Sequence, residues 1–218
     1  MPDGVESLYP FLYAGQVDLD AVMEQVRQST AAKAAEAVTL REVVAEREAD
    51  RLAACAQAMA RSFATGGKLL AFGNGGSSTD AQDVVTTFMN PGDGGRPLPA
   101  ISLTSDVAVV TALSNDIGFE VVFARQVAAW GRPGDVALGL STSGGSANVL
   151  RGFEEASRRG LLTVGLAGYD GGKMAEADTI DYLFVVPSSS VHRIQEAQAT
   201  VYHVLWELTQ QALAERAQ

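Results

Sequence analysis

The sequence has few of the residues that bind metals or form covalent cross-links. Its 218 residues include one cysteine, Cys55, and two histidines, His192 and His203. A lone cysteine cannot form an internal disulfide, and Cys55 lacks the CxxC or Cys/His spacing of a redox or metal site. We therefore expect Cys55 to act as a small apolar residue in a helix.

Basic residues are scarce relative to acidic ones. The chain has 16 Lys and Arg against 26 Asp and Glu, which gives a formal net charge of −10 at pH 7. Proteins that bind nucleic acids or anionic lipid normally carry a basic face. The composition therefore predicts no nucleic acid partner and no membrane partner, so that any bound phosphate must be held by local groups.

Long apolar runs are absent. The N-terminus begins Met1-Pro2-Asp3-Gly4, without a basic region, and its apolar patch extends only from Leu8 to Tyr13. A membrane span needs about 20 apolar residues, and a signal peptide needs a basic start and a longer apolar stretch. We expect a cytoplasmic protein whose N-terminal apolar patch packs on its own body or on a neighbouring subunit.

Proline and glycine are missing between Val17 and Ala64, where Ala, Glu, Arg and Val dominate. Apolar residues recur there three and four positions apart, which predicts helix in two or more segments. We interpret residues 1–64 as a helical extension and helices, part of the same domain as residues 65–218.

Short apolar runs then alternate with amphipathic stretches. Each run is typical of a buried strand, and together they are Lys68–Phe72, Ala100–Thr104, Val136–Leu140, Leu162–Ala167 and Tyr182–Val186. The intervening predicted helices are Thr79–Phe88, Val107–Leu113, Val121–Trp130, Ala147–Arg159 and Gly172–Ala177, and a last helix covers Val191–Ala217. The pattern predicts a three-layer α/β/α sandwich around a five-stranded parallel sheet, related to flavodoxin-like and Rossmann-like folds.

Two loops between a predicted strand and a predicted helix carry the strongest functional signal. They are Gly73–Ser78 and Ser141–Ser146, and the second has four hydroxyls within six residues. Glycines allow close approach to an anion, hydroxyls donate hydrogen bonds, and a helix N-terminus attracts negative charge. The first loop has neither the Lys-Ser/Thr of a Walker A motif nor dinucleotide-binding spacing. A phosphate monoester is therefore the expected ligand.

The motifs and their order resemble the sugar isomerase (SIS) domain family, in particular its phosphoheptose isomerases. Five motifs carry the resemblance, namely Gly73-Asn74-Gly75-Gly76-Ser77 with Asp80-Ala81, Ser114-Asn115-Asp116 with Gly118-Phe119, Arg132-Pro133-Gly134-Asp135, Ser141-Thr142-Ser143-Gly144, and Arg193-Ile194-Gln195-Glu196. The resemblance implies a homotetramer with active sites at subunit interfaces. It also implies aldose–ketose isomerisation of an acyclic sugar phosphate through an enediol(ate).

The resemblance assigns substrate-binding roles to one set of residues. The phosphate is expected to contact Ser77, Ser141, Thr142, Ser143 and Ser146, and the wider set of substrate-binding residues adds Asn74, Gly75, Gly76, Asp116 and Gln195. The reaction also needs a base, an acid and a group that stabilises the oxyanion. Relatives supply these with a His and a Glu after the first loop and a Gln and a His on the last helix, and in some members these four bind zinc.

The chain departs from this pattern at the chemical end of the site. Asp83 stands at the His position, and Thr87 stands at the Glu position four residues on. His192 replaces an Asp before Gln195, Pro91 replaces an Arg, and Gly145 replaces an Asn. Because Thr87 cannot act as a carboxylate base, the catalytic candidates become His203, Asp83 and His192.

A metal ion is not expected to be required. Asp83, Gln195 and His203 form an incomplete ligand set, since a stable zinc site uses four ligands. His192 and His203 are separated by eleven residues, about 16 Å along a helix, so we hypothesise that different subunits contribute them to one site. The alternative to an isomerase is a non-catalytic SIS protein that binds a sugar phosphate or a protein partner in a regulatory role.

Overall fold

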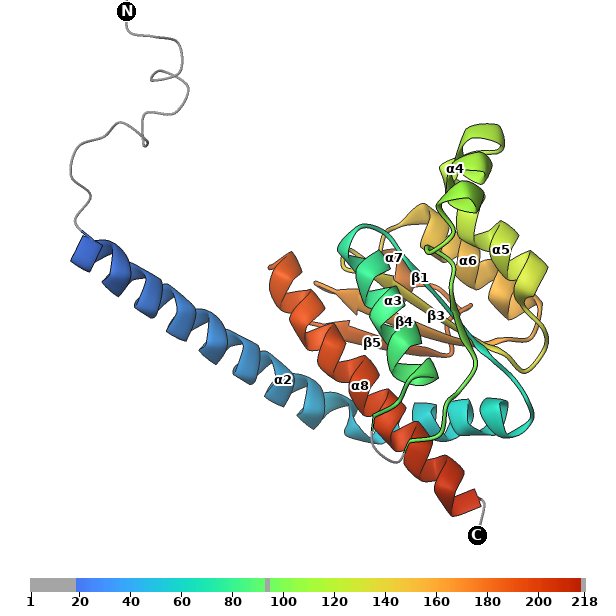
Figure 1. The fold of residues 1–218 in the computed structure, drawn as a ribbon, viewed down its shortest axis with the longest axis horizontal. Coiled ribbons are helices and arrows are strands. Elements are labelled where there is room, and N and C mark those ends of the chain that lie inside the picture. The colour runs from blue at the N-terminus through green and yellow to red at the C-terminus, as the bar shows by residue number, and fades with distance from the viewer. Residues whose placement is uncertain (1–18, 93–94, 217–218) are drawn as a thin grey trace, which may run out of the picture. The chain divides into compact units, whose positions relative to one another are not determined.

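The computed structural model describes residues 19–92 and 95–216 (Figure 1). The predicted packing of the N-terminal apolar patch, and the last residue of the predicted C-terminal helix, lie outside the described residues. The chain divides into two compact units, residues 1–38 and 39–218. The sheet and all residues of the candidate site belong to the second unit.

After the long N-terminal helix, helices and strands alternate, and this alternation was predicted from the sequence. The elements in chain order are α2 (Leu19–Ala64), β1 (Leu69–Gly73), α3 (Gly76–Met89), β2 (Ala100–Ser102), α4 (Val107–Asp116), the 3-10 turn η2 (Phe119–Val121), α5 (Val122–Trp130), β3 (Val136–Ser141), α6 (Ala147–Arg158), β4 (Leu162–Gly168), α7 (Gly172–Ala175), β5 (Tyr182–Val186) and α8 (Val191–Arg216).

Helix α2 corrects one prediction. It is a single helix of 46 residues, where the sequence had suggested two or more segments. The physical reason is that it contains no proline or glycine to break it, and alanine has the highest helix propensity. Cys55 lies in this helix, as predicted, and the structure buries it, with 0% of its surface exposed. Burial raises the pKa of the Cys55 thiol to about 12, so the thiol stays protonated and unreactive at neutral pH.

The five strands form one parallel sheet in the order β2-β1-β3-β4-β5. Alternate residues of each strand face opposite helical layers. Leu69 and Ala71 of β1 pack with α2, α3 and α8, whereas Leu70 and Phe72 pack with α5 and α6. The predicted three-layer sandwich is therefore confirmed, and Figure 1 shows α3 and α8 crossing one face of the sheet.

The strand order reverses between β1 and β3. From β1 the chain crosses to β2 on one side, and it then returns to β3 on the other side of β1. In open parallel sheets, ligands bind outside the carboxyl ends of the strands at such a reversal point. Gly73 of β1 lies opposite Leu140 of β3 in the register, so the two predicted phosphate-binding loops leave neighbouring strands at this point.

Candidate active site

The first loop brings the N-terminus of α3 to the reversal point. Gly75 has a φ of 56°, a conformation that glycine adopts without strain. A Cβ on Gly76 would lie 2.1 Å from Nε2 of Gln195, so only glycine lets α8 approach this closely. Ser77 follows with only 4% of its surface exposed. The loop therefore places a buried serine at a helix N-terminus, where an anion is stabilised.

The second loop gathers its hydroxyls beside β3. The Oγ atoms of Ser141 and Ser146 are 2.9 Å apart, and those of Ser141 and Ser143 are 3.5 Å apart. Ser146 occupies the N-cap position of α6, but its side chain makes no capping hydrogen bond. It turns toward Ser141 instead. This cluster at a helix N-terminus has the donors and the dipole that a phosphate requires.

A turn behind the second loop supports it. Gly144 has a φ of 62°, and a Cβ there would lie 1.9 Å from the carbonyl oxygen of Gly171. The backbone N–H of Met174 donates to the Gly144 carbonyl at 2.9 Å, and that of Gly168 donates to the Thr142 carbonyl at 2.9 Å. The hydroxyl cluster is therefore held by the end of β4 and the start of α7.

A pair of asparagines links the two loops. Nδ2 of Asn74 donates to Oδ1 of Asn148 at 2.8 Å, and Nδ2 of Asn148 donates to Oδ1 of Asn74 at 2.8 Å. Asn148 is buried in the first turn of α6. This reciprocal pair fixes the first loop against the helix that follows the second. We call the two loops together the phosphate cradle, defined as residues 73–78 and 141–146.

The chain departs from the family pattern at Asp83 and Thr87 on α3, opposite His203 on α8. We call this part of the site the altered end. Asp83 on α3 accepts a hydrogen bond from the hydroxyl of Tyr202 on α8 at 2.7 Å. The same carboxylate oxygen, Oδ2, is 4.0 Å from Nε2 of His203. Both Asp83 and His203 are half-exposed, whereas Tyr202 is buried. The structure thus brings together Asp83 and His203, two of the three predicted catalytic residues.

A second contact between these helices involves Asp80. Nε2 of Gln195 donates to Oδ2 of Asp80 at 3.3 Å. Burial, with a smaller contribution from Asp83, raises the pKa of Asp80 to about 6, although the Gln195 hydrogen bond opposes the shift. Because α3 begins at Gly76, Asp80 lies in its second turn. Gln195 and Asp80 together join the cradle to the altered end.

Two predicted site residues lie apart from this cluster. Asp116 is exposed at the end of α4, where Asn115 Nδ2 donates to its carboxylate at 2.8 Å. His192 is exposed in the first turn of α8, and within residues 19–92 and 95–216 its ring forms no hydrogen bond or ion pair. One copy of the chain therefore does not bring Asp116 or His192 to the Asp83–His203 pair.

The residues of the altered end do not fit a zinc ion. In the described part of the chain, no group of three or more His, Cys, Asp and Glu side chains is arranged to hold a metal. Thr87, one turn after Asp83, supplies no carboxylate, and Oδ2 of Asp83 already accepts a hydrogen bond from the Tyr202 hydroxyl. A stable zinc site uses four ligands, and with Thr87 in place of the family Glu this end of the site offers three of that set, Asp83, Gln195 and His203.

Sequence reasoning missed Tyr202 and Asn148. The contacts of both residues join elements far apart in the chain, with separations of 119 residues for Tyr202–Asp83 and 74 for Asn148–Asn74. One feature of the sequence could have indicated Tyr202, because this residue directly precedes His203 on a helix that was predicted to carry catalytic groups. An anion cradle at the reversal point of a parallel sheet, beside a histidine–carboxylate pair, suits a protein that binds a phosphorylated ligand and can transfer a proton on it.

Comparison with known proteins agrees with this class. The SIS domain family matches residues 33–168. The phosphoheptose isomerase of Aquifex aeolicus is 46% identical over 160 residues, which cover 73% of this chain and 83% of that protein. The enzyme of Nitratidesulfovibrio vulgaris (strain Miyazaki F) is 42% identical over 193 residues, which cover 88% and 92%.

Solved structures give the same result. A phosphoheptose isomerase from Neisseria gonorrhoeae superimposes with a TM-score of 0.77 at 36% identity, over 84% of this chain and 97% of that one. One from Francisella tularensis gives a TM-score of 0.76 at 33% identity, over 90% and 100%. The chain belongs to the SIS domain family and, within it, to the phosphoheptose isomerases.

Proposed function

We propose that the protein interconverts sedoheptulose 7-phosphate and its aldose phosphate isomer, with an acid–base set rearranged relative to its family. The observation that carries the proposal is the Ser141–Ser146 hydroxyl cluster, placed at the reversal point of the sheet and joined through α3 to the Asp83–His203 pair. The cradle binds the phosphate, and the sugar chain extends along α3 toward α8.

The spacing along α3 suits a long sugar. Asp83 follows Ser77 by six residues, which is about 9 Å of helix. An extended seven-carbon chain separates its phosphate from carbons 1 and 2 by a comparable length. His203 then acts as the base that moves the proton between these carbons. Asp83 stabilises the imidazolium that forms.

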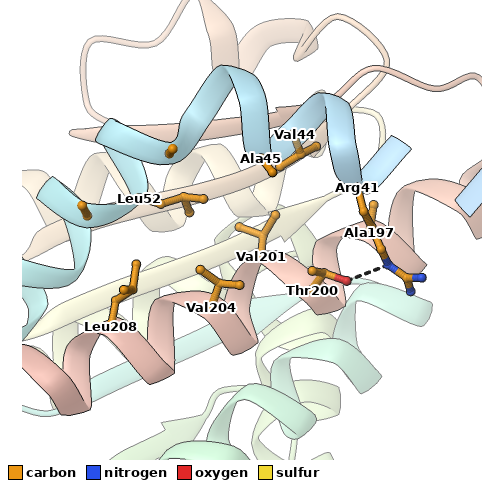
Figure 2. Close-up of a pocket in the computed structure, with 11 residues that line it drawn as sticks. Arg41, Val44, Ala45, Leu52, Ala197, Thr200, Val201, Val204 and Leu208 are labelled. Carbon is orange, nitrogen blue, oxygen red and sulfur yellow. Dashed lines mark hydrogen bonds between the residues drawn. The ribbon is translucent and has the colours of Figure 1, made fainter. Parts of the chain in front are cut away.

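The chain is proposed to act as a homo-oligomer, with a tetramer as the specific expectation and active sites at subunit interfaces. An apolar groove of about 350 Å³ lies between residues 41–53 of α2 and α8 (Figure 2). Val44, Leu52 and Val201 line it, and Arg41 donates from Nε to Thr200 Oγ1 at 2.8 Å. A second copy of the chain covering this groove would remove apolar surface from water.

The α4–η2 region also supports assembly. None of the ten residues of α4 is buried. Val107 is 71% exposed, Ile117 56% and Phe119 52%. Because Asp116 lies in this region, an interface here would bring its carboxylate to the site of a neighbouring subunit. The exposed His192 is proposed to reach a neighbouring site in the same way.

The cellular location is proposed from composition and chemistry. Among the described residues, no helix is long and apolar enough to cross a membrane. A cytoplasmic enzyme of carbohydrate metabolism suits a chain with one buried thiol.

A non-catalytic phosphosugar-binding protein is the second candidate. Thr87 favours it, because the family carboxylate is missing there. The deciding experiment incubates the purified protein with sedoheptulose 7-phosphate and with C5 to C8 ketose and aldose phosphates in deuterated water. We expect deuterium at C1 or C2 of the C7 substrate. Thermal stabilisation by the sugar phosphate without any exchange would identify the binding protein instead.

A further inference from the structure

Tyr202 lies at the centre of the altered end, although its role is not implied by the family resemblance. Its side chain is 2% exposed, so the surrounding core fixes the ring. The ring packs against the His203 imidazole with centroids 4.9 Å apart, and the hydroxyl donates to Asp83 Oδ2 at 2.7 Å. One buried residue therefore contacts both members of the proposed acid–base pair.

The contact of His203 with its own helix determines which ring nitrogen is free. Nδ1 lies 2.7 Å from the carbonyl oxygen of Ala199. A carbonyl oxygen can only accept a hydrogen bond, so Nδ1 carries the proton in the neutral ring. Nε2 is then unprotonated, and it faces Asp83 Oδ2 at 4.0 Å. The base position and the carboxylate that stabilises its protonated form are thus both defined.

Asp83 has little else to hold it. It is half-exposed on α3, and a solvated aspartate samples several rotamers. In the described chain, its one hydrogen bond to a side chain comes from Tyr202. Without that bond, the carboxylate is free to turn into solvent, where its interaction with an imidazolium is screened.

We propose that Tyr202 is a positioning residue that holds Asp83 toward Nε2 of His203, and that within this Tyr–Asp–His chain His203 transfers the proton without a metal ion. The inference rests on the proposed isomerase function for its kinetic consequences. In the reaction, Nε2 takes the proton from the carbon next to the carbonyl. The C–H electron pair becomes the C=C bond of the enediolate, and the carbonyl oxygen takes the negative charge. The hydroxyl proton of the neighbouring carbon then passes to this oxygen, and Nε2 returns its proton to the neighbouring carbon as the new carbonyl forms there, which completes the isomerisation.

Tyr202 itself does not exchange protons in this scheme. Burial and the adjacent Asp83 carboxylate raise the pKa of the Tyr202 hydroxyl well above its ordinary value. The hydroxyl therefore remains a neutral hydrogen-bond donor at every working pH. This property suits a residue that orients the carboxylate and never competes for the substrate proton.

The kinetic test compares Tyr202→Phe with Tyr182→Phe. Tyr182 is the first residue of the edge strand β5, whereas the cradle lies at the carboxyl ends of the inner strands β1 and β3, so Tyr182 is a matched control. We expect Tyr202→Phe to lower kcat about tenfold with KM within twofold, because a hydrogen bond to a charged group is lost. Tyr182→Phe should leave both constants unchanged. A rise in KM with kcat unchanged in Tyr202→Phe would overturn the proposal.

A double-mutant cycle separates positioning from general stabilisation. Once Asp83→Asn has removed the carboxylate, adding Tyr202→Phe should lower kcat by less than twofold more, because the two residues act through the same contact. A further tenfold loss in the Asp83→Asn background would show that Tyr202 acts independently of Asp83, and the proposal would be wrong.

A spectroscopic test does not depend on turnover. The chain has two histidines, so His192→Asn leaves His203 as the one imidazole in the spectrum. We expect ¹⁵N shifts of a ring protonated at Nδ1, and we expect Tyr202→Phe, but not Tyr182→Phe, to move them. Unchanged His203 shifts would reject the positioning role. If Tyr202→Phe moves the His203 signals but the protein exchanges no deuterium into any sugar phosphate, the positioning role of Tyr202 is supported. The proposed isomerase function is then wrong.

Metal independence is tested by metal content and by chelation. The protein purified with zinc present and then dialysed should contain well under one zinc ion per chain, and EDTA should leave kcat unchanged. The control is the double variant Asp83→His with Thr87→Glu, which restores the family's four-ligand pattern and should retain about one zinc ion per chain. Stoichiometric zinc in the unmodified protein, with activity lost in EDTA, would overturn this part of the proposal.

Discussion

The phosphate cradle and the altered end of the site are built in different ways. The cradle depends on backbone geometry, because Gly76 and Gly144 occupy places where a Cβ would overlap Gln195 and Gly171. The altered end depends on side chains projecting from two helices, where Asp83, Tyr202 and His203 meet across a half-exposed surface. A helix face accepts new side chains without moving its backbone. The binding half of a site can therefore stay constant while the chemical half changes.

The largest predicted effect separates chemistry from binding. His203→Ala should lower kcat about a thousandfold, since general base catalysis typically contributes that much. The affinity for inorganic phosphate should stay within twofold, because His203 lies outside the cradle. Deuterium exchange measures the first quantity and calorimetry the second. If the variant kept more than a tenth of the original turnover, another residue would be the base.

Substitutions in the phosphate cradle should have the opposite effect, weakening substrate binding and leaving the chemical step nearly unchanged. Replacing Ser141 and Ser146 together by alanine removes two hydroxyls that lie 2.9 Å apart. Hydrogen bonds to a charged group contribute about 1.5–3 kcal/mol each, so KM should rise at least tenfold while kcat changes little. Ser157→Ala, an exposed serine near the other end of α6, is the matched control. A loss confined to kcat would mean that the cluster does not bind the phosphate.

The sequence predicted the sheet well because each strand is a continuous apolar run. Tyr182–Val186 was predicted with the bounds that β5 has. At the sheet edge the prediction was less accurate, since β2 ends at Ser102 and not at Thr104. The hydroxyls of these two residues are 2.8 Å apart, and this local contact accompanies the end of the strand.

The site was predictable only where its residues are contiguous. Ser141, Ser143 and Ser146 lie close together in the chain, and the structure gathers their hydroxyls in one cluster. The partners of Asp83 were not predictable in the same way. Whether Tyr202 or a neighbouring residue faces α3 depends on how α8 is rotated against the sheet, and packing of its buried residues sets that rotation.

The link between the two loops should show a smaller effect. Asn148→Ala leaves the Asn74 amide without its partner and should lower the free energy of unfolding by about 1–2 kcal/mol, with KM rising a few fold. Because the pair is reciprocal, Asn74→Ala combined with Asn148→Ala should cost less than the two single changes added together. Urea unfolding of the three variants measures this. Strict additivity would show that the asparagines stabilise the loops separately.

The smallest effect concerns Asp80, where the two halves of the site meet. Its pKa is raised to about 6 in the folded protein from an ordinary value of 3.8. A raised carboxyl pKa favours folding when the group is protonated, so its contribution to stability is complete below about pH 4 and is lost as the pH rises through about 6. Asp80→Asn should remove this dependence and, with partial solvent screening, stabilise the protein by about 1 kcal/mol at pH 7.5 relative to pH 4.5. Urea unfolding at both pH values, with the exposed Asp178→Asn as control, measures the difference. A loss of stability at pH 7.5 would show that the ionised Asp80 carboxylate is needed to hold Gln195 beside the cradle.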